Sequence, residues 1–287
     1  MTGLFRILLV TLLVLTVSEA FGNVIYVDSL RGDDAADGSN PEAITLTSGP
    51  VRTIRRGVEL LRLGGTLNIA NNGQPYYESM EIVGGRLGGT PLRPTVIEGN
   101  GAELNGSFPV PPPAWRKAGE RLWKFTPLRK GHYRLILSNR ALPEIVLPRN
   151  SRQLPEIPDG QWAAWKGSIY YQAGKLDVPQ DLDLWYAVRS VGITLYDVHD
   201  VVVRDLKVRH FRIDGVNAHD RSENIVLENI TAEENGRAGM VSAGTSFVTI
   251  NKPVIKNNGR YSVLITEKAG VQIDDETQVT PAPTIAE

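Results

Sequence analysis

The segment GITLYDVHDVVVRDLKVRHFRID, residues 192–214, is followed without a break by GVNAHDRSENIVLENITAEENGR (215–237) and AGMVSAGTSFVTINKPVIKNNGR (238–260). Each segment has 23 residues and the same order of features: a short apolar run, a polar turn and a second apolar run. A fourth segment begins at Tyr261. A repeat of this length, with two or three short strands in each period, predicts a parallel β-helix in which successive coils stack.

Stacking turns the period into spatial neighbours. Residues 23 positions apart are predicted to lie one above another, about 4.8 Å apart. Asn235 and Asn258 then form a ladder of turns, and Gly236 and Gly259 supply the positive φ of those turns. The sequence therefore predicts an all-β solenoid whose functional groups lie in columns.

The composition excludes several classes of function. Lys and Arg together number 31 and Asp and Glu 32, so no basic surplus points to a nucleic-acid partner. The chain has no Cys, which excludes disulfides, thiol chemistry and a lipid-anchored cysteine. Nothing in the sequence indicates a nucleotide, haem or zinc cofactor, and the oligomeric state stays open.

Residues 1–20 have the organisation of a secretory signal peptide. Arg6 supplies the positive start, residues 7–17 form an apolar run, and Ser18-Glu19-Ala20 places small residues at the cleavage site. Eleven apolar residues are too few to span a bilayer. We therefore expect a periplasmic or secreted protein with no membrane contact after cleavage; an uncleaved anchor is the alternative.

Residues 21–107 are predicted to form the first coils and their cap. Residues 23–28 read as a strand, and strands recur at 66–70, 79–83, 94–98 and 102–105. Between them, residues 51–63 have apolar positions on one helical face, with Thr53 as a capping residue. An amphipathic helix here would cover the open N-terminal end of the solenoid.

Residues 108–191 break the rhythm and predict an inserted β subdomain. The prolines at 111–113 mark the break, and all five Trp fall in this range. Residues 192–275 resume the coils, and residues 276–287 are rich in Pro and Thr and predict a flexible tail. Few regular coils remain, so the chain can also be a shortened relative of a longer protein.

The N-terminal stretch resembles the entry of secreted β-helix proteins. The resemblance rests on Tyr26-Val27-Asp28, the Gly32-Asp33 loop, Arg52-Thr53-Ile54 and Gly64-Gly65-Thr66, and with the repeats it covers nearly the whole mature chain. It is similar to the pectate-lyase-like superfamily, which implies a right-handed parallel β-helix. Lyases, epimerases, hydrolases and inert adhesins share this fold, so the fold alone names no activity.

One turn resembles a family with a known reaction. His219-Asp220-Arg221-Ser222, followed by residues 224–227, is similar to the Asp-Pro-His-Asp-Arg-Ser turn of bacterial alginate C5-epimerases. Asn217 and Ala218 stand where that family has Asp and Pro. The resemblance implies roles for a preceding histidine, nearest here to His210, and for an arginine on the next coil, nearest to Arg237.

Two polar columns follow from the 23-residue period, His210–Glu233–Lys256 and Asp214–Arg237–Arg260. A uronate needs a base beside its C5 proton and cations that neutralise its carboxylate, and such columns would supply both. Lys256 is an alternative base, and Asp214 and Asp220 would orient these groups or hold Ca²⁺. Ordinary charge ladders between coils are the alternative interpretation.

His219 is the strongest single candidate. The period places Ala218, Val241 and Leu264 in an inward apolar column, which points Asn217 and His219 outward. An outward histidine beside Asp220 can act as acid or base near neutral pH, or hold a surface turn. On the same argument Met240, Val263 and Ile265 are predicted to lie outside, as a covered or binding surface.

Two further features offer binding groups. Trp162 and Trp165 are candidate platforms for sugar rings, although most Trp of the insert are expected in its core. Asp28, Asp33, Asp34 and Asp37 resemble a loose Ca²⁺ loop, for which a structural turn is the favoured interpretation. No strict metal-ligand pattern is present.

The sequence therefore predicts an exported β-helix protein acting on an acidic polysaccharide by β-elimination or C5 epimerisation. His219, His210, Arg237, Lys256, Arg260, Asp214 and Asp220 are the candidate catalytic residues, and Asn217, Glu233, Trp162 and Trp165 the candidate binding residues. A glycan-binding scaffold without activity is one alternative. A hydrolase using two of Asp214, Asp220 and Glu233 is another.

Overall fold

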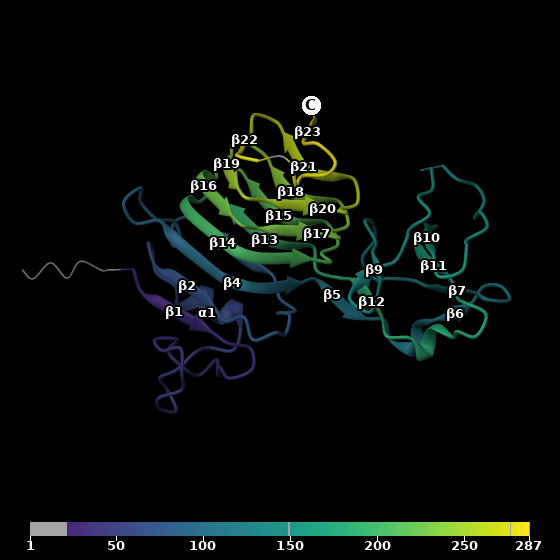
Figure 1. The fold of residues 1–287 in the computed structure, drawn as a ribbon, viewed down its shortest axis with the longest axis horizontal. Helices are drawn as coiled ribbons and strands as arrows, with labels where there is room; N and C mark the ends of the chain where they lie inside the picture. Colours follow the sequence, from purple (N-terminus) through teal and green to yellow (C-terminus); the bar gives the residue numbers. More distant parts are fainter. Residues whose placement is uncertain (1–21, 149, 276, 287) are drawn as a thin grey trace, which may run out of the picture.

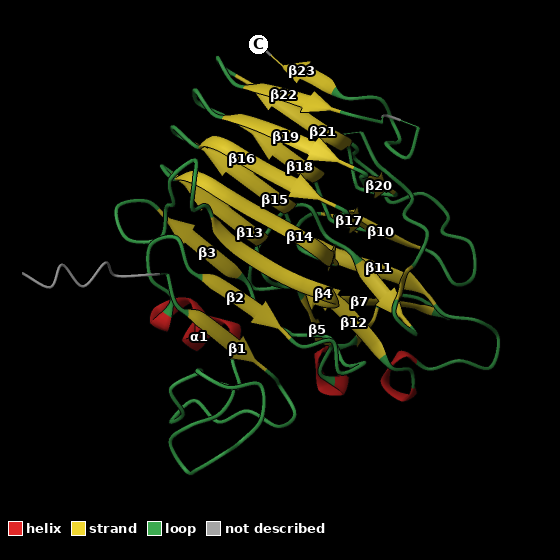
Figure 2. Ribbon diagram, turned by 60° about the vertical axis from the view of Figure 1, so that its left-hand side comes forward, coloured by secondary structure: helices red, strands yellow, loops and turns green. Residues whose placement is uncertain are grey.

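The computed structural model describes residues 22–148, 150–275 and 277–286, and its main body is a solenoid with two parallel sheets (Figures 1 and 2). The predicted signal peptide, residues 1–20, lies outside the described residues. Sheet A contains β1 (Val24–Val27), β2 (Thr66–Ile69), β4 (Thr95–Asn105), β14 (His199–Arg209), β16 (Glu223–Glu228), β19 (Phe247–Asn251) and β22 (Gly270–Ile273), with β17 (Thr231–Glu233) and β20 (Val254–Lys256) beside the distal half of β14. Sheet B contains β3 (Met80–Val83), β13 (Val191–Tyr196), β15 (Asp214–His219), β18 (Ala238–Ser242), β21 (Tyr261–Thr266) and β23 (Thr284–Ala286).

The strand register corrects the period by one residue. Val216 of β15 pairs with Met240 of β18, a separation of 24 residues, and Met240 pairs with Val263 of β21, a separation of 23. The first of the three copies is therefore one residue longer than a uniform repeat allows. A one-residue slip moves side chains to the opposite face of a strand, so this detail decides which residues face the core.

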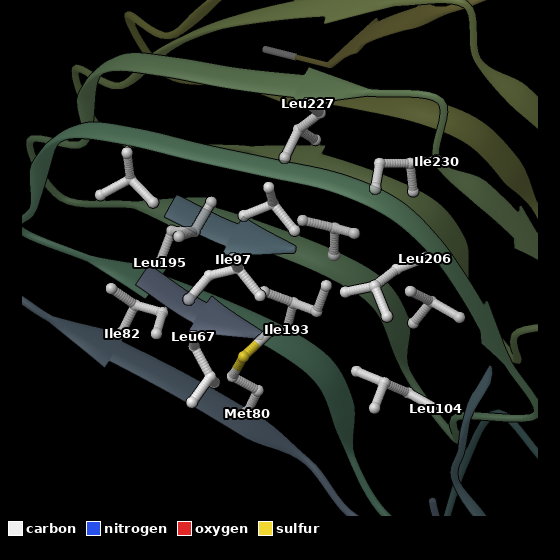
Figure 3. Close-up of a cluster of buried hydrophobic side chains, with 14 of the residues drawn as sticks. Leu67, Met80, Ile82, Ile97, Leu104, Ile193, Leu195, Leu206, Leu227 and Ile230 are labelled. Atoms are coloured by element: carbon white, nitrogen blue, oxygen red, sulfur yellow. The ribbon is translucent and has the colours of Figure 1, made fainter. Parts of the chain in front are cut away.

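The core between the sheets differs accordingly from the expected columns. Val216, Ala218, Met240 and Val263 are buried in the main hydrophobic cluster, and Ile265 packs against it. The prediction that Met240, Val263 and Ile265 lie outside is wrong. Figure 3 shows how leucine, isoleucine and methionine side chains of neighbouring coils fill the space between the sheets.

Val241 and Leu264 were expected inside, and this is also wrong. With Ala238 they form a separate small cluster, covered in part by Tyr261 and Ala286. Asn217 pairs with Val241 and Val241 with Leu264, so the three share the outer column of sheet B. Only Ala218 of the predicted inward column faces the core.

The turn ladder at Asn235 is present, but its glycines have another role. The Asn235 side chain donates to the Val208 carbonyl at 3.1 Å and accepts from the Phe211 amide at 3.0 Å. Positive φ is adopted by Glu234 and Asn257, not by Gly236 and Gly259 as predicted. Gly236 is needed for close approach, because a Cβ there would lie 2.1 Å from the Arg212 carbonyl oxygen.

Helix α1 (Ile54–Leu60) covers the N-terminal end of the solenoid. The Thr53 side chain accepts from the Arg56 amide, which confirms the predicted cap. Ile54 and Val58 join the core cluster together with Leu67 of β2. Among the described residues, no helix has the length and apolar character required to cross a bilayer.

The chain leaves the solenoid after β4 and forms a separate lobe before it re-enters at β13 (Figure 1). One antiparallel sheet of this lobe contains β5 (Ser107–Pro109), β12 (Leu184–Ala187), β8 (Leu135–Leu137) and β9 (Arg140–Ala141). The other contains β10 (Trp162–Trp165), β11 (Ser168–Gln172), β7 (Leu122–Phe125) and β6 (Arg116–Lys117). The lobe has its own core, which includes Trp115, Phe125, Trp162 and Tyr171.

The inserted lobe is fixed to the turns of the coils by buried arginines. Arg212 donates to the Lys130 carbonyl at 2.9 Å, and Arg134 donates to the Asn235 carbonyl at 3.2 Å. At the other end of the chain the structure differs from the flexible tail expected over residues 276–287. Residues 284–286 form β23, which extends sheet B beside β21.

Candidate functional site

The outer face of sheet B carries the residues of the epimerase-like turn. Tyr196 of β13 pairs with His219 of β15, and their rings lie 4.8 Å apart. The His219 Nδ1 is 3.6 Å from an Asp220 carboxylate oxygen. We call Tyr196, His219 and Asp220 the His219 cluster; all three side chains reach solvent.

The Asp220 carboxylate has a second neighbour in Tyr196. Its hydrogen bond with the Tyr196 hydroxyl, followed by its charge, raises the pKa of that tyrosine. Tyr196 is therefore a neutral hydroxyl near pH 7, able to donate a proton. Next to it, the Arg221 guanidinium lies 3.1 Å from the Asp197 carboxylate on the exposed edge of the turn.

Asp214 and Arg237 form the predicted pair, in a more closed form than expected. Arg237 Nε and Nη2 donate to the two Asp214 oxygens at 2.9 and 2.6 Å, and Asn217 donates to the same carboxylate at 2.9 Å. The hydrogen bond to Asp214 raises the pKa of Arg237. The Asp214 carboxylate is fully buried and already neutralises its arginine, so this pair holds the surface and does not present a free cation.

His132, on the inserted lobe, is a histidine that the period could not place. Burial lowers its pKa, and the charges of Arg260 and Arg237 lower it further. It lies in a small cavity of about 220 Å³ that Arg260 and Glu144 also line. Arg260 thus faces the inserted lobe, and its alignment with Asp214 is not a contact with that carboxylate.

His210 lies inside the turn and not on the surface. Its side chain is fully buried, with Nε2 2.7 Å from Glu234 and Nδ1 3.2 Å from the Asn105 amide. The predicted His210–Glu233 column is wrong because the longer first coil places Arg209 beside Glu233. Glu233 and the exposed Lys256 do pair, on the far sheet, away from the His219 cluster.

The two tryptophans predicted as platforms differ in exposure. Trp162 is fully buried in the core of the inserted lobe, and its indole N–H donates to the Leu142 carbonyl. It cannot stack on a ligand, so that prediction is wrong. Trp165 is half-buried, with Tyr170 at 5.7 Å and the Lys166 ammonium over its ring at 4.3 Å.

The N-terminal aspartates are bound to the chain itself. Burial opposes ionisation of Asp28, but hydrogen bonds from Asn72, Arg31 and nearby amides outweigh it and lower its pKa to about 2. Asp34 accepts from the amides of Arg52 and Thr53. Across the described residues no group of three or more acidic, His or Cys side chains gathers in metal-binding geometry.

A trough opens beside the His219 cluster, where the first strands of sheet B meet the inserted lobe. Two adjoining cavities of about 450 and 350 Å³ form it, and both contain Ser79, Glu81 and Arg189. We call them together the Arg189 trough. The residues that matter below are Glu78, Glu81, Arg129, Arg189, Val191 and Thr194.

The trough presents two cations that the protein does not neutralise at short range. Among the described residues, the exposed guanidinium groups of Arg129 and Arg189 donate no hydrogen bond and form no ion pair. Glu78 lies at the opposite wall and accepts from the Ile54 and Arg55 amides at the start of α1. Burial raises the pKa of Glu78 despite these bonds and the charge of Arg189.

The trough and the His219 cluster share one surface. Val191 and Thr194 line the trough and pair directly with Asp214 and Asn217 of the next strand. Tyr196 is two residues beyond Thr194 on the same face of β13. The sequence analysis missed Arg129 and Arg189 because neither stands in the repeat; the only signal was their position beside the breaks of the rhythm.

Comparisons with known proteins agree with this architecture. Residues 170–277 match the family model described as a right-handed beta helix region. The chain has the right-handed parallel β-helix fold. This confirms the resemblance to the superfamily and the fold class; no curated protein matches the sequence.

Two solved structures are similar to the β-helix over most of its length. XylC in complex with xylose gives a TM-score of 0.54 at 12% identity, covering 87% of this chain and 57% of XylC. A structure named as a glycoside hydrolase gives 0.56 at 11% identity, covering 85% of this chain and 68% of its own. The chain spans just over half the length of XylC, and at these identities the likeness concerns the fold alone.

Proposed function

We propose that this β-helix protein is exported, binds an acidic polysaccharide along the outer face of β13 and acts on its uronate units. The observation that carries the proposal is the pair of unneutralised guanidinium groups, Arg129 and Arg189, which face one cavity from the inserted lobe and from the solenoid. Arginine binds carboxylates through two parallel hydrogen bonds and is always charged. An acidic sugar would supply the missing partner.

The path of the polymer follows the exposed side chains of one strand. Arg189 stands at the start of the path and Tyr196 at its end, seven residues apart, or roughly 23 Å in extended chain. Val191 and Thr194 lie between them on the floor. Several sugar units fit on this path, with carboxylates bound at the trough and a reacting unit at the His219 cluster.

The His219 cluster has the groups for chemistry at C5 of a uronate. The His219 imidazole takes the C5 proton, and the charge that develops on the carboxylate is met by the neighbouring Arg221. In elimination the C4–O4 bond breaks, a C4=C5 double bond forms, and the Tyr196 hydroxyl protonates the departing oxygen. In epimerisation Tyr196 returns a proton to C5 from the opposite face. Asp220 orients both groups.

Hydrolysis is a second candidate, favoured by a separate observation. Glu78 and Glu81 line the same cavity, and the raised pKa of Glu78 suits a general acid, with Glu81 as the ionised partner. The neighbour named as a glycoside hydrolase and the xylose complex of XylC support a carbohydrate substrate for this fold. Both candidate reactions use the same polymer-binding surface.

One experiment separates these reactions. The chain from residue 21 is incubated with alginate, pectate and glycosaminoglycans, with and without Ca²⁺. Unsaturated uronate is followed by ultraviolet absorbance, C5 exchange by NMR in heavy water, and new reducing ends by a colorimetric assay. We expect absorbance or exchange that falls at least about a hundredfold in His219→Gln and stays unchanged in His199→Gln, whose side chain is exposed on sheet A.

Each other outcome assigns the function differently. Reducing ends without absorbance or exchange, lost in Glu78→Gln and Glu81→Gln but kept in His219→Gln, would replace uronate chemistry by hydrolysis. Binding without any product would leave a glycan-binding scaffold. Absence of binding to every acidic polymer would overturn the proposal as a whole.

A further inference from the structure

An aromatic pair stands at the junction between the solenoid and the inserted lobe, on the side of Arg189 away from Glu78. The rings of Tyr77 and Trp185 stack at 5.2 Å with planes 20° apart. Tyr77 comes from the loop before β3 and Trp185 from β12, so the pair joins the two parts of the molecule. It lies outside the repeats and outside every residue used in the proposed reactions.

The two sides of this pair differ in chemistry. On one side a mainly apolar cavity of about 470 Å³ is lined by Phe108, Pro109 and Val188, with Phe108 57% exposed. Arg189 closes this cavity and also belongs to the Arg189 trough, so the two spaces are continuous. On the other side a cavity of about 230 Å³ is lined by polar groups, including Asn105, Asn139 and Asp183.

Aromatic faces bordered by hydrogen-bonding side chains suit a pyranose ring. The C–H face of the sugar packs on the aromatic rings, and its hydroxyl edge meets amide and carboxylate oxygens. A purely apolar ligand would leave Asn139 and Asp183 without a partner, which is costly on binding. The two cavities together therefore favour a sugar over a lipid chain or an apolar peptide.

The charges around the pair disfavour an acidic sugar at this position. Asp183 accepts from the Trp185 indole N–H at 2.7 Å, which places its carboxylate beside the rings. Burial raises the pKa of Tyr77, and the negative charges of Glu103 and Asp183 raise it further. A carboxylate placed here would meet like charges, whereas at Arg189, the next position, it would meet a cation.

We propose that Tyr77 and Trp185 form a subsite for an uncharged sugar unit next to the acidic unit held at Arg189. The ligand is then a polymer in which uncharged and uronate sugars alternate, and not a polymer of uronates alone. This inference rests on the proposed binding of an acidic polysaccharide, whose substrate class it narrows. It requires no particular reaction at the His219 cluster.

The test compares two hexasaccharides by isothermal titration calorimetry at fixed salt. One is a hyaluronan fragment, in which uronate alternates with an uncharged N-acetylated sugar; the other contains galacturonate only. We expect the alternating fragment to bind wild type at least about tenfold more tightly. Trp185→Ala and Tyr77→Ala remove this advantage and leave the galacturonate affinity within about twofold, because they remove stacking area and no charge.

Two further variants keep the test decisive if truncation of Trp185 disturbs β12. Asp183→Asn keeps the acceptor for the indole N–H and removes the charge, so we expect it to raise the galacturonate affinity about threefold and leave the alternating fragment unchanged. Trp165→Ala is the matched control, since that tryptophan lies on β10 in the other sheet of the lobe. It should change neither affinity.

The outcomes separate the subsite from the proposed function. Equal binding of both fragments, with no effect of Trp185→Ala, Tyr77→Ala or Asp183→Asn, would overturn the subsite while acidic binding stands. Binding of an uncharged xylan fragment that depends on Trp185 but not on Arg189 would keep an aromatic subsite and overturn the acidic polymer. Absence of binding to either acidic fragment would overturn the proposed function together with this inference.

Discussion

The coils over residues 192–275 and the junction around Arg189 use the same residue types for opposite ends. In the coils almost every polar side chain described above is bonded to the protein: Asn235 to two backbone groups, Asp214 to Arg237, and His210 to Glu234. At the junction Arg129 and Arg189 have no such bonds among the described residues. Polar residues in the repeat hold the coils, whereas the unpaired ones beside it are free for a ligand.

The largest effect on stability is expected at the Asn235 ladder. Asn235→Ala leaves the buried Phe211 N–H and Val208 carbonyl without their partner, so we expect the free energy of unfolding to fall by about 4 kcal/mol. Urea unfolding measures this. Asn251→Ala, on β19, is the control and should cost less than about 1 kcal/mol. A loss of similar size in both variants would mean that the ladder is not special.

The second effect depends on pH and concerns Glu234. Burial would raise its pKa, but the hydrogen bond and charge of His210 and the charge of Arg209 lower it from 4.5 to about 2. A carboxyl with a lowered folded-state pKa stabilises the fold above its unfolded value and loses that contribution as the pH falls through the folded one. The contribution of about 3 kcal/mol is therefore present at pH 7 and disappears between about pH 4.5 and 2.

Glu234→Gln makes this visible. The variant should be less stable than wild type by about 3 kcal/mol at pH 7, and the difference should shrink toward zero near pH 2. Urea unfolding over a series of pH values gives both curves. A difference that does not change with pH would show that the charge of Glu234 contributes nothing and that only its shape matters.

The third effect tests whether Asp214 belongs to the fold or to the chemistry. Asp214→Asn removes the charge opposite Arg237, which remains partly solvated, and we expect a loss of about 2 kcal/mol. Thermal unfolding measures the loss. Turnover, measured below the melting transition, should keep at least half of its wild-type value. A fall in turnover of a hundredfold with unchanged melting would return Asp214 to the candidate catalytic groups.

The smallest effect on stability is expected at the junction. Arg129→Gln and Arg189→Gln should each change the free energy of unfolding by less than about 0.5 kcal/mol, because the exposed guanidinium groups make no short contact to lose. Each should nevertheless weaken binding of an acidic oligosaccharide about tenfold. Calorimetry and urea unfolding of the same preparations check both. Stability losses above 2 kcal/mol would make these arginines structural and remove the contrast with the coils.

The sequence predicted the solenoid, the helical cap and the outward position of His219, because these follow from periodic patterns. It erred where one extra residue in a coil changed the faces of Val241, Leu264 and Met240, since a period read by eye carries that error into every later column. The trough was beyond reach for another reason. Arg129, Arg189 and Trp185 come together only because the lobe folds back on the solenoid, and no local spacing encodes that contact.

The place where the lobe joins the solenoid gives it an unusual independence. The Val188 and Arg189 amides both donate to the Gly106 carbonyl, so the chain leaves and returns at almost one point. The ladder from β4 to β14 passes this point without using a residue of the lobe. Replacing residues 107–187 by a short turn would keep the coil closed, since loop closure depends only weakly on loop length. The lobe is in this sense an exchangeable module, and a protein built this way can change its ligand by changing one insertion while the scaffold stays the same.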